Sequence, residues 1–130
     1  MPPEALWWSD DMSAFGPEKQ NKDVWKWTVM IMQPEFITRT MVEEAMKVAA
    51  RKKRPVSLPL VRFEAFKEGK AVQTMHIGPF SHEGPAIERL HAFIKQSGSR
   101  ITGKHHEIYL SGLRRTAPDK LKTIIRQPMA

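Results

Sequence analysis

The sequence predicts an α+β fold, because stretches with the period of a β-strand are interspersed with two stretches that have the period of an α-helix. Residues 24–33 and 104–111 fit a period of two, as half-buried strands do. Residues 35–53 and 85–96 instead place apolar side chains three and four positions apart, as helices with one buried face do. The length of 130 residues suits a single small domain that buries a core without disulfide bonds.

The first half of the chain is expected to contain one strand and one helix. Pro34 ends the strand of residues 24–33, since proline cannot donate to a β ladder. The helix of residues 35–53 finishes in the basic run at 51–54, and cations complement the negative end of a helix dipole. We interpret this run as a solvated last turn in preference to a nucleic-acid patch.

The second half is expected to contain a hairpin, a helix and two further strands. A Lys-Glu-Gly turn separates the alternating stretches 61–66 and 70–77, which follow a linker at 55–59. Pro85 suits the first turn of the second helix. After the strand of residues 104–111, a last strand is predicted over about residues 121–127.

An acidic residue stands inside the strand of residues 104–111, where a carboxylate is costly unless it is used. With a period of two, Glu107 and Tyr109 share one face of this strand. His106 and Ile108 share the other. If the second face packs on a core, the first presents a carboxylate and a phenol side by side to a cleft.

Charge and composition exclude several classes of protein. Without cysteine the chain has no disulfides, thiolate metal ligands or cysteine nucleophile, which is compatible with a reducing cytoplasm, and we expect a cytoplasmic protein. No apolar run approaches the roughly 20 residues of a membrane helix, so no membrane partner is expected. The net charge of +7 attracts polyanions. Because no recognition motif accompanies it, no dedicated nucleic-acid site is expected.

Two stretches echo each other in the same order, which favours a duplicated unit. Residues 6–9 (Leu-Trp-Trp-Ser) match residues 108–111 (Ile-Tyr-Leu-Ser). Each copy continues to a Pro-acid-Lys motif and then to a strand that closes in Gln-Pro. Trp7 and Tyr109 are therefore equivalent across a pseudo-twofold axis, and the seam between the units is predicted to form an aromatic-walled pocket. The later motifs lie at residues 17–19 and 118–120, and at residues 33–34 and 127–128.

The first copy is interpreted as incomplete, because a hairpin and a helix precede the echo only in the second copy. We expect a single domain over residues 1–130, with a remnant of the first unit at 1–34, a connecting helix and linker at 35–59, and a second unit at 60–130. A shortened relative, a fragment and association with another subunit all fit this pattern. A homodimer that completes the first unit is one such association.

Five blocks of residues stand in an order that is specific as a set. They are Leu-Trp-Trp-Ser-Asp at 6–10, Trp-Lys-Trp-Thr at 25–28, Met-His-Ile-Gly-Pro-Phe at 75–80, His-His-Glu-Ile-Tyr-Leu-Ser at 105–111 and Arg-Arg-Thr-Ala-Pro at 114–118. Together they resemble the GyrI-like small-molecule-binding family. The resemblance implies SOUL-like tandem strand-helix-strand-strand units, with antiparallel sheets, helices packed on one side and a ligand cleft between the units. The first unit would be incomplete here.

The resemblance also implies a function. The fold is shared with drug-binding domains of transcriptional activators and with gyrase-inhibitory proteins, and an acidic residue on the matching strand, here Glu107, typically faces the ligand. The branch with Trp-Trp and Glu-x-Tyr is similar to bacterial detoxifying proteins that hydrolyse cyclopropane-bearing DNA-alkylating natural products. Members of this kind usually carry roughly 70 to 80 more N-terminal residues. They also tend to carry Asp-Pro where this chain has Gly112-Leu113.

The favoured enzyme hypothesis is opening of a spirocyclopropane dienone by water. Glu107 would take the proton from water if burial beside aromatic rings raises its pKa toward neutrality. Tyr109 would hydrogen-bond the developing phenolate oxygen. A hydrophobic or cationic aromatic ligand would stack on the tryptophans. The residues expected to bind it are Trp7, Trp8, Trp25, Trp27, Met30, Met32, His76 and Phe80.

A binding role without turnover stays open. In that alternative Glu107 pairs with Arg114, His76 or a basic ligand, and the domain is a drug sequestrant, a sensor or a gyrase-inhibitor-like module. No metal site is expected, because adjacent residues such as His105 and His106 point apart on a strand and cannot chelate from one face. No cofactor is expected either. Haem-associated relatives exist in the superfamily, but neither His76 nor His91 lies in a convincing haem motif.

Overall fold

The computed structural model describes residues 1–9 and 25–130, which belong to two compact units. Unit 1 comprises Met1–Met32 and Glu68–Ala130, and unit 2 comprises Gln33–Lys67. Unit 1 holds the strands and one α-helix, and unit 2 holds the other α-helix. The elements are β1 (Pro3–Trp8), β2 (Lys26–Ile31), α1 (Arg39–Lys52), β3 (Ala71–Ile77), α2 (Gly84–Gln96), β4 (His105–Tyr109) and β5 (Lys122–Pro128), with short 3₁₀ turns at Leu58–Leu60, Phe80–His82 and Pro118–Lys120.

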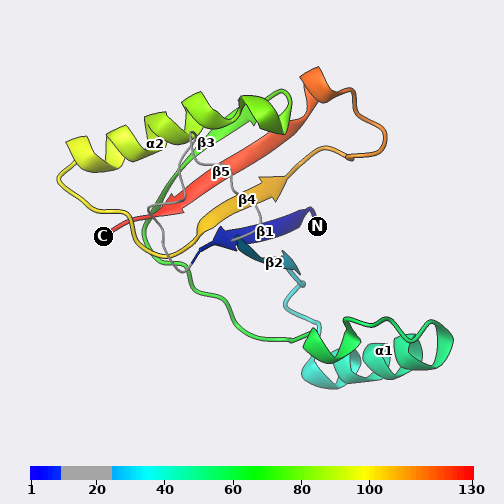
Figure 1. The fold of residues 1–130 in the computed structure, drawn as a ribbon. Coiled ribbons are helices and arrows are strands. Elements are labelled where there is room, and N and C mark those ends of the chain that lie inside the picture. The colour runs from blue at the N-terminus through cyan, green and yellow to red at the C-terminus, as the bar shows by residue number, and fades with distance from the viewer. Residues whose placement is uncertain (10–24) are drawn as a thin grey trace. The chain divides into compact units, whose positions relative to one another are not determined.

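Unit 1 is built on one five-stranded antiparallel sheet, in the order β2-β1-β4-β5-β3 (Figure 1). The strands expected at residues 24–33, 104–111 and 121–127 are all present as β2, β4 and β5. Strand β4 lies in the middle, so both of its edges are paired. The α+β class and the antiparallel sheet are confirmed.

The register of β1 against β4 gives the sheet a local twofold relation. Ala5 lies opposite Glu107, and the flanking pairs are Leu6 with His106 and Glu4 with Ile108. An offset of 102 residues relates Leu6 to Ile108 and Glu4 to His106, so it exchanges the two flanking pairs. The local twofold axis therefore passes between Ala5 and Glu107. The sequence echo has the same offset. The Pro-acid-Lys motif at residues 17–19 lies outside the described residues, and so does the segment 10–17, which its acids, Gly16 and Pro17 predict to be a turn. The division into sequence units stays a prediction.

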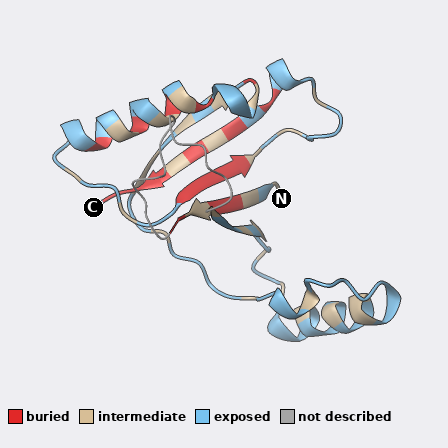
Figure 2. Cartoon of the chain, viewed as in Figure 1, coloured by how far each residue is buried: buried red, intermediate tan, exposed pale blue. Residues whose placement is uncertain are grey.

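Helix α2 covers one face of the sheet along β3 and β5 (Figure 1). Its buried residues Ala86 and Leu90 pack against Ile125 of β5, which is fully inaccessible to solvent. The helix is buried along its sheet side and exposed along the other (Figure 2). Ile125 lies opposite Glu107, so this core is on the Glu107 face. The Glu107 face of β4 thus packs on a core as well, so it is not given over to a cleft alone.

Unit 2 consists of α1 and the segment that follows it. The helix begins at Arg39, four residues later than predicted, because the Thr38 side chain caps it by accepting a hydrogen bond of 3.2 Å from the Met41 backbone nitrogen. None of its residues is buried within the structure. In the described part of the chain, no helix has both the length and the apolar character needed to cross a bilayer.

The predicted hairpin of residues 61–66 and 70–77 was wrong in its first strand. Residues 61–66 form no strand, and β3 pairs with β5 along its whole length instead. The backbone carbonyl of Phe63 accepts a hydrogen bond of 3.0 Å from the Arg39 guanidinium of α1. Alternation alone could not distinguish this segment from a strand.

Candidate functional site

The centre of the candidate site is the face of β4 that carries Glu107 and Tyr109. The predicted alternation is confirmed, because both residues lie opposite β5 residues, Ile125 and Thr123, on one face of the sheet. On the other side of β4, the residue opposite Glu107 is Ala5. A methyl group there leaves room beside a carboxylate. Strand β4 is therefore paired with β1 on one edge and with β5 on the other, and these two strands fix the positions of Glu107 and Tyr109.

His105 holds the Glu107 carboxylate from the same face of β4. Its Nε2 lies 2.7 Å from Glu107 Oε2, and both side chains are buried. Burial by itself raises the pKa of Glu107, but the hydrogen bond and charge of His105, with hydrogen bonds from Glu83 and Tyr109, outweigh it and lower the pKa. A pKa raised toward neutrality was the condition set for Glu107 as a base, and this condition is not met. Pairing with Arg114 or His76 is replaced by pairing with His105.

Glu83 is a second buried carboxyl group in the site, and sequence reasoning missed it. It is 7% exposed, against 8% for Glu107, and its side chain contributes to lowering the pKa of Glu107. It stands at the N-cap of α2, yet its side chain makes no capping hydrogen bond. An acid at the start of a helix is ordinarily assigned to the helix dipole, which hid this role. The two residues that share its turn, Gly78 and Phe80, show how it is placed.

The turn before α2 carries Glu83 to β4. Gly78 adopts a φ of 134°, open to glycine, and its backbone nitrogen donates to the Leu121 carbonyl at 2.8 Å. His76 Nε2 lies 2.9 Å from the Pro79 carbonyl oxygen and so ties β3 to the turn. The Glu83 backbone nitrogen then donates to the carbonyl of Phe80 at 3.2 Å. His76 thus supports the turn through its ring.

Tyr109 is held between two aromatic residues. Its hydroxyl accepts a hydrogen bond of 3.2 Å from Trp7 Nε1, and its ring meets Phe80 edge to face at 5.7 Å between centroids. Burial and the neighbouring Glu107 charge raise the pKa of Tyr109 well above its ordinary value of 10. The phenol therefore stays protonated.

Three tryptophans gather beside Tyr109. The Trp7 ring lies 6.2 Å from that of Trp25 and 6.4 Å from that of Trp27. Trp27 lies directly opposite Trp7 in the sheet and is 61% exposed. Large flat apolar surface next to a buried acid suits an aromatic ligand better than a polar one.

The matching family model describes a GyrI-like small-molecule-binding domain and covers residues 3–129. This chain belongs to the GyrI-like family. The predicted resemblance and its small-molecule-binding class are confirmed. Among proteins with curated functions, none matches.

Solved structures from Listeria innocua resemble this GyrI-like domain along 99% of its length. One is an uncharacterized conserved protein with 41% identity and a TM-score of 0.85, and another is a hydrolase with 41% identity and a TM-score of 0.80. A further hydrolase has 38% identity and a TM-score of 0.81. The chain spans 63%, 62% and 63% of those three chains.

The GyrI-like sheet separates the predicted ligand residues between its two faces. Trp7 and Trp27 share the face of Glu107, whereas Trp8 and Met30 belong to the opposite face by register. The ammonium group of Lys104 lies 3.6 Å from the centre of the Trp8 ring, a cation–π contact. Met32 follows β2 and is exposed. Trp25 and Phe80, by their ring contacts, adjoin the Glu107 face.

The opposite face of β4 carries a separate buried network. His106 is 1% exposed, and its Nε2 and Nδ1 atoms lie 2.8 Å from carboxylate oxygens of Glu4 and Glu68, respectively. Arg126 adds a contact of 3.3 Å to Glu68. His105 and His106 thus bind different carboxylates on opposite faces. Within residues 1–9 and 25–130, no group of three or more His, Cys, Asp or Glu residues is arranged to hold a metal ion.

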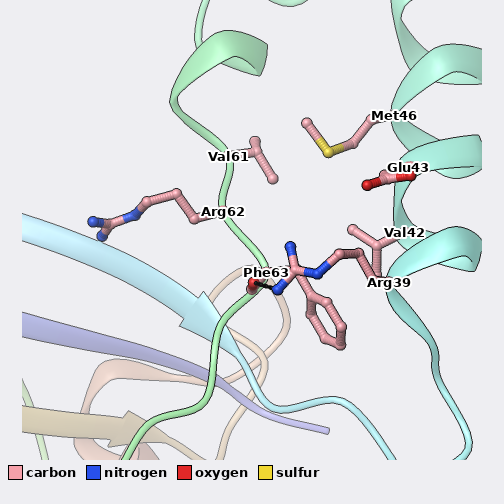
Figure 3. A pocket seen from close by; sticks show the side chains of 7 residues that line it. All are labelled: Arg39, Val42, Glu43, Met46, Val61, Arg62 and Phe63. Carbon is pink, nitrogen blue, oxygen red and sulfur yellow. Dashed lines mark hydrogen bonds between the residues drawn. The ribbon is translucent and has the colours of Figure 1, made fainter.

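Unit 2 of the GyrI-like chain has a pocket of its own, of about 430 Å³. The Arg39 guanidinium lies over the Phe63 ring at 5.6 Å and crosses this pocket from α1 (Figure 3). None of the residues predicted to form the functional site lines it. The lining residues are Arg39, Val42, Glu43, Met46, Val61, Arg62 and Phe63.

Proposed function

We propose that this domain binds a planar hydrophobic or cationic aromatic molecule on the Glu107 face and hydrolyses a cyclopropane ring of a DNA-alkylating compound. The observation that carries the proposal is the position of a buried carboxylate, Glu107, and a phenol, Tyr109, on one face of β4 beside exposed aromatic rings. Such a combination offers an acceptor for a water proton, a donor for a developing oxyanion and a surface for stacking. Hydrolase relatives in the family add support.

The proposed reaction adds one water molecule. The water oxygen attacks a cyclopropane carbon, the strained carbon–carbon bond breaks, and its electron pair moves into the dienone to give a phenolate. Glu107 accepts the proton that water loses, and the phenolate oxygen gains a proton to complete the product. Tyr109 donates a hydrogen bond to that oxygen while its charge develops. Because His105 lowers the pKa of Glu107, the carboxylate is fully ionised at neutral pH, so relief of ring strain has to drive the transfer.

The ligand would lie against Trp7, Trp27 and Phe80. Trp27 and Phe80 are exposed enough to stack on a ring that enters from solvent. Trp25 contacts Trp7 at its edge, and would support that ring. His76 would not contact the ligand directly. Its bond to the Pro79 carbonyl would instead hold the turn that carries Phe80.

Mass-detected turnover of a spirocyclopropane dienone by the purified chain tests the proposal. We expect a product heavier by one water, and we expect Glu107→Gln to abolish turnover while it retains ligand affinity. Glu64→Gln is a matched control, because it makes the same substitution at a side chain that is 62% exposed. Turnover that persists in Glu107→Gln would remove Glu107 from the role of base.

A second candidate is a binding module without turnover, such as a sequestrant or a sensor. One observation favours it: the close pairing of Glu107 with His105 lowers the pKa of the carboxyl group and makes it a weak base. Tight binding of the dienone without product would select this candidate. A gyrase-inhibiting role would instead require a protein partner and no turnover.

Association with a second copy is also a proposal. Trp27, Val29 and Ile31 of β2 lie on the Glu107 face and are 61%, 58% and 54% exposed. Strand β2 is also an edge strand of the five-stranded sheet. Light scattering that reports a dimer would support association, and a monomer that turns over the dienone would show that a second copy is not required.

A further inference from the structure

A pocket of about 430 Å³ lies within unit 2, between α1 and the segment that follows it, and the reaction proposed above does not use it. We propose that this pocket binds the zwitterion of an apolar amino acid, with leucine as the model ligand. The charged groups of the ligand pair with Arg39 and Glu43, and its side chain lies against the apolar wall. The lining residues all belong to unit 2, so the proposal does not depend on the hydrolysis at Glu107.

The pocket has the size and the walls of a small-molecule site. Its volume falls within the roughly 300–1,000 Å³ that such sites span. Met46 of α1 and Val61 of the following segment point toward each other across it, and Val42 lies one turn before Met46 (Figure 3). None of residues 33–67 is buried, so these apolar side chains remain partly in contact with water. An apolar group in the pocket would cover them, which favours its binding.

Arg39 contributes a fixed cation to the pocket. Its guanidinium donates a hydrogen bond of 3.0 Å to the Phe63 carbonyl and lies 5.6 Å from the centre of the Phe63 ring. A guanidinium has five N–H donors in a planar fork, whose geometry matches that of a carboxylate. Within the described part of the chain, the Phe63 carbonyl is the one acceptor of Arg39. Its other donors are therefore available to a carboxylate of the ligand.

Glu43 contributes the opposite charge. It follows Arg39 by four residues on α1, a spacing at which opposite charges ordinarily pair. Arg39 is instead held against Phe63, and Glu43 forms no ion pair or side-chain hydrogen bond with any residue that the structure describes. Its carboxylate extends from α1 toward the pocket (Figure 3). This carboxylate is therefore available to an ammonium group of the ligand.

The two charges together decide the class of ligand. An amine without a carboxylate would be repelled by Arg39, and a carboxylate without an amine would be repelled by Glu43. Arg62 also lines the pocket, but its side chain points away from α1 (Figure 3), and its guanidinium lies 3.9 Å from the Glu64 carboxylate. A zwitterion satisfies both Arg39 and Glu43. An apolar amino acid adds a side chain that suits the apolar wall.

Methyl NMR of the intact chain, labelled with ¹³C in the methionine methyl groups, tests the proposal. Met46 reports on the pocket, and Met41 is the internal control because it is exposed on α1 and does not line the pocket. L-Leucine should shift the Met46 signal to saturation and leave the Met41 signal in place. A Met46 signal that leucine does not shift, or shifts without saturation, would overturn the proposal.

Two analogues of leucine test the need for both charges. Isoamylamine lacks the carboxylate and 4-methylpentanoate lacks the ammonium group, whereas both keep the branched apolar end. We expect each to bind with a Kd at least threefold higher than that of leucine. If either analogue shifts the Met46 signal with the same Kd as leucine, the pocket does not recognise a zwitterion and the proposal is wrong.

The substitution Glu43→Gln tests the ammonium contact, because it removes the charge and keeps the size of the side chain. We expect the Kd of leucine to rise at least threefold. Glu44→Gln is the matched control, since it makes the same change at the next position of α1, outside the pocket lining, and it should leave the Kd unchanged. Equal values of Kd in the two variants would refute the pairing of the ligand with Glu43.

Discussion

The indole nitrogen of Trp7 donates a hydrogen bond of 3.2 Å to the hydroxyl oxygen of Tyr109, and the two residues stand at equivalent positions of the local twofold of the sheet. Trp7 lies directly opposite His105, so this bond runs diagonally between β1 and β4. Strand β1 therefore contributes the aromatic ring of Trp7, and β4 contributes the polar groups of Glu107 and Tyr109. The local twofold thus places two different side chains, an indole and a phenol, at equivalent positions and within hydrogen-bonding distance of each other.

Tyr109 should titrate far above the ordinary range for tyrosine. It is the one tyrosine of the chain, so the tyrosinate absorbance reports this site alone. Burial and the Glu107 charge raise its pKa from 10, and a raised pKa in the folded state stabilises the fold below pH 10 and loses that contribution as the pH rises. We expect tyrosinate to appear only with alkaline unfolding. In Glu107→Gln it should appear at lower pH, and appearance near pH 10 in the wild type would contradict the burial of the phenol.

Glu107 should make the protein sensitive to acid. Its pKa is lowered in the folded state from an ordinary value of 4.5, so its stabilising contribution is complete above that pH and is lost as the pH falls through the folded value. Thermal unfolding followed from pH 7 to pH 3 should show a drop in Tm below about 4.5. We expect a shallower drop in Glu107→Gln. Equal drops in the two proteins would place the acid sensitivity elsewhere.

The His106 network should be costly to break. His106→Ala would leave the carboxylates of Glu4 and Glu68, each 12% exposed, without their shared partner. Leaving a buried hydrogen-bonding group without its partner costs about 1–3 kcal/mol, and urea unfolding should show a loss of at least that size. Arg62→Ala is the control, because its pair with Glu64 is exposed and 3.9 Å long, and such pairs contribute at most about 1 kcal/mol. Similar losses in the two variants would contradict a special role for the buried network.

The sheet could be predicted from sequence because its signals are local. Period-two alternation placed Glu107 and Tyr109 on one face and His106 on the other, and the register bears this out. The echo around Trp7 and Tyr109 predicted that β1 and β4 are related, and both form hydrogen-bonded pairs with the following strand. Alternation failed at residues 61–66, which form no strand and where the Arg39 guanidinium bonds the Phe63 carbonyl.

The partners within the site could not be predicted in the same way. His105 and Glu107 are two positions apart, so their contact was accessible to the period-two argument, but attention to His106 and to metal chelation obscured it. Glu83 is distant in sequence, and only the turn from Gly78 and the packing of α2 bring it to β4. The sign of the Glu107 pKa shift depends on these two neighbours.

The two faces of the sheet give a last prediction that separates ligand contacts from structural ones. Trp27 lies exposed on the Glu107 face, and Trp8 lies on the opposite face under Lys104. Titration with ethidium, a planar aromatic cation, should show that Trp27→Ala weakens binding. An aromatic pair contributes about 0.5–1.5 kcal/mol, which corresponds to roughly a 2- to 13-fold increase in Kd.

Trp8→Ala is the matched control, because it removes the same side chain from the other face of the same sheet. We expect its Kd to stay within twofold of the wild type, although loss of the Lys104 contact should lower Tm slightly. Isothermal titration calorimetry on both variants measures the comparison directly. If Trp8→Ala weakens binding more than Trp27→Ala does, the ligand binds on the face that carries His106, and Glu107 is not part of its site.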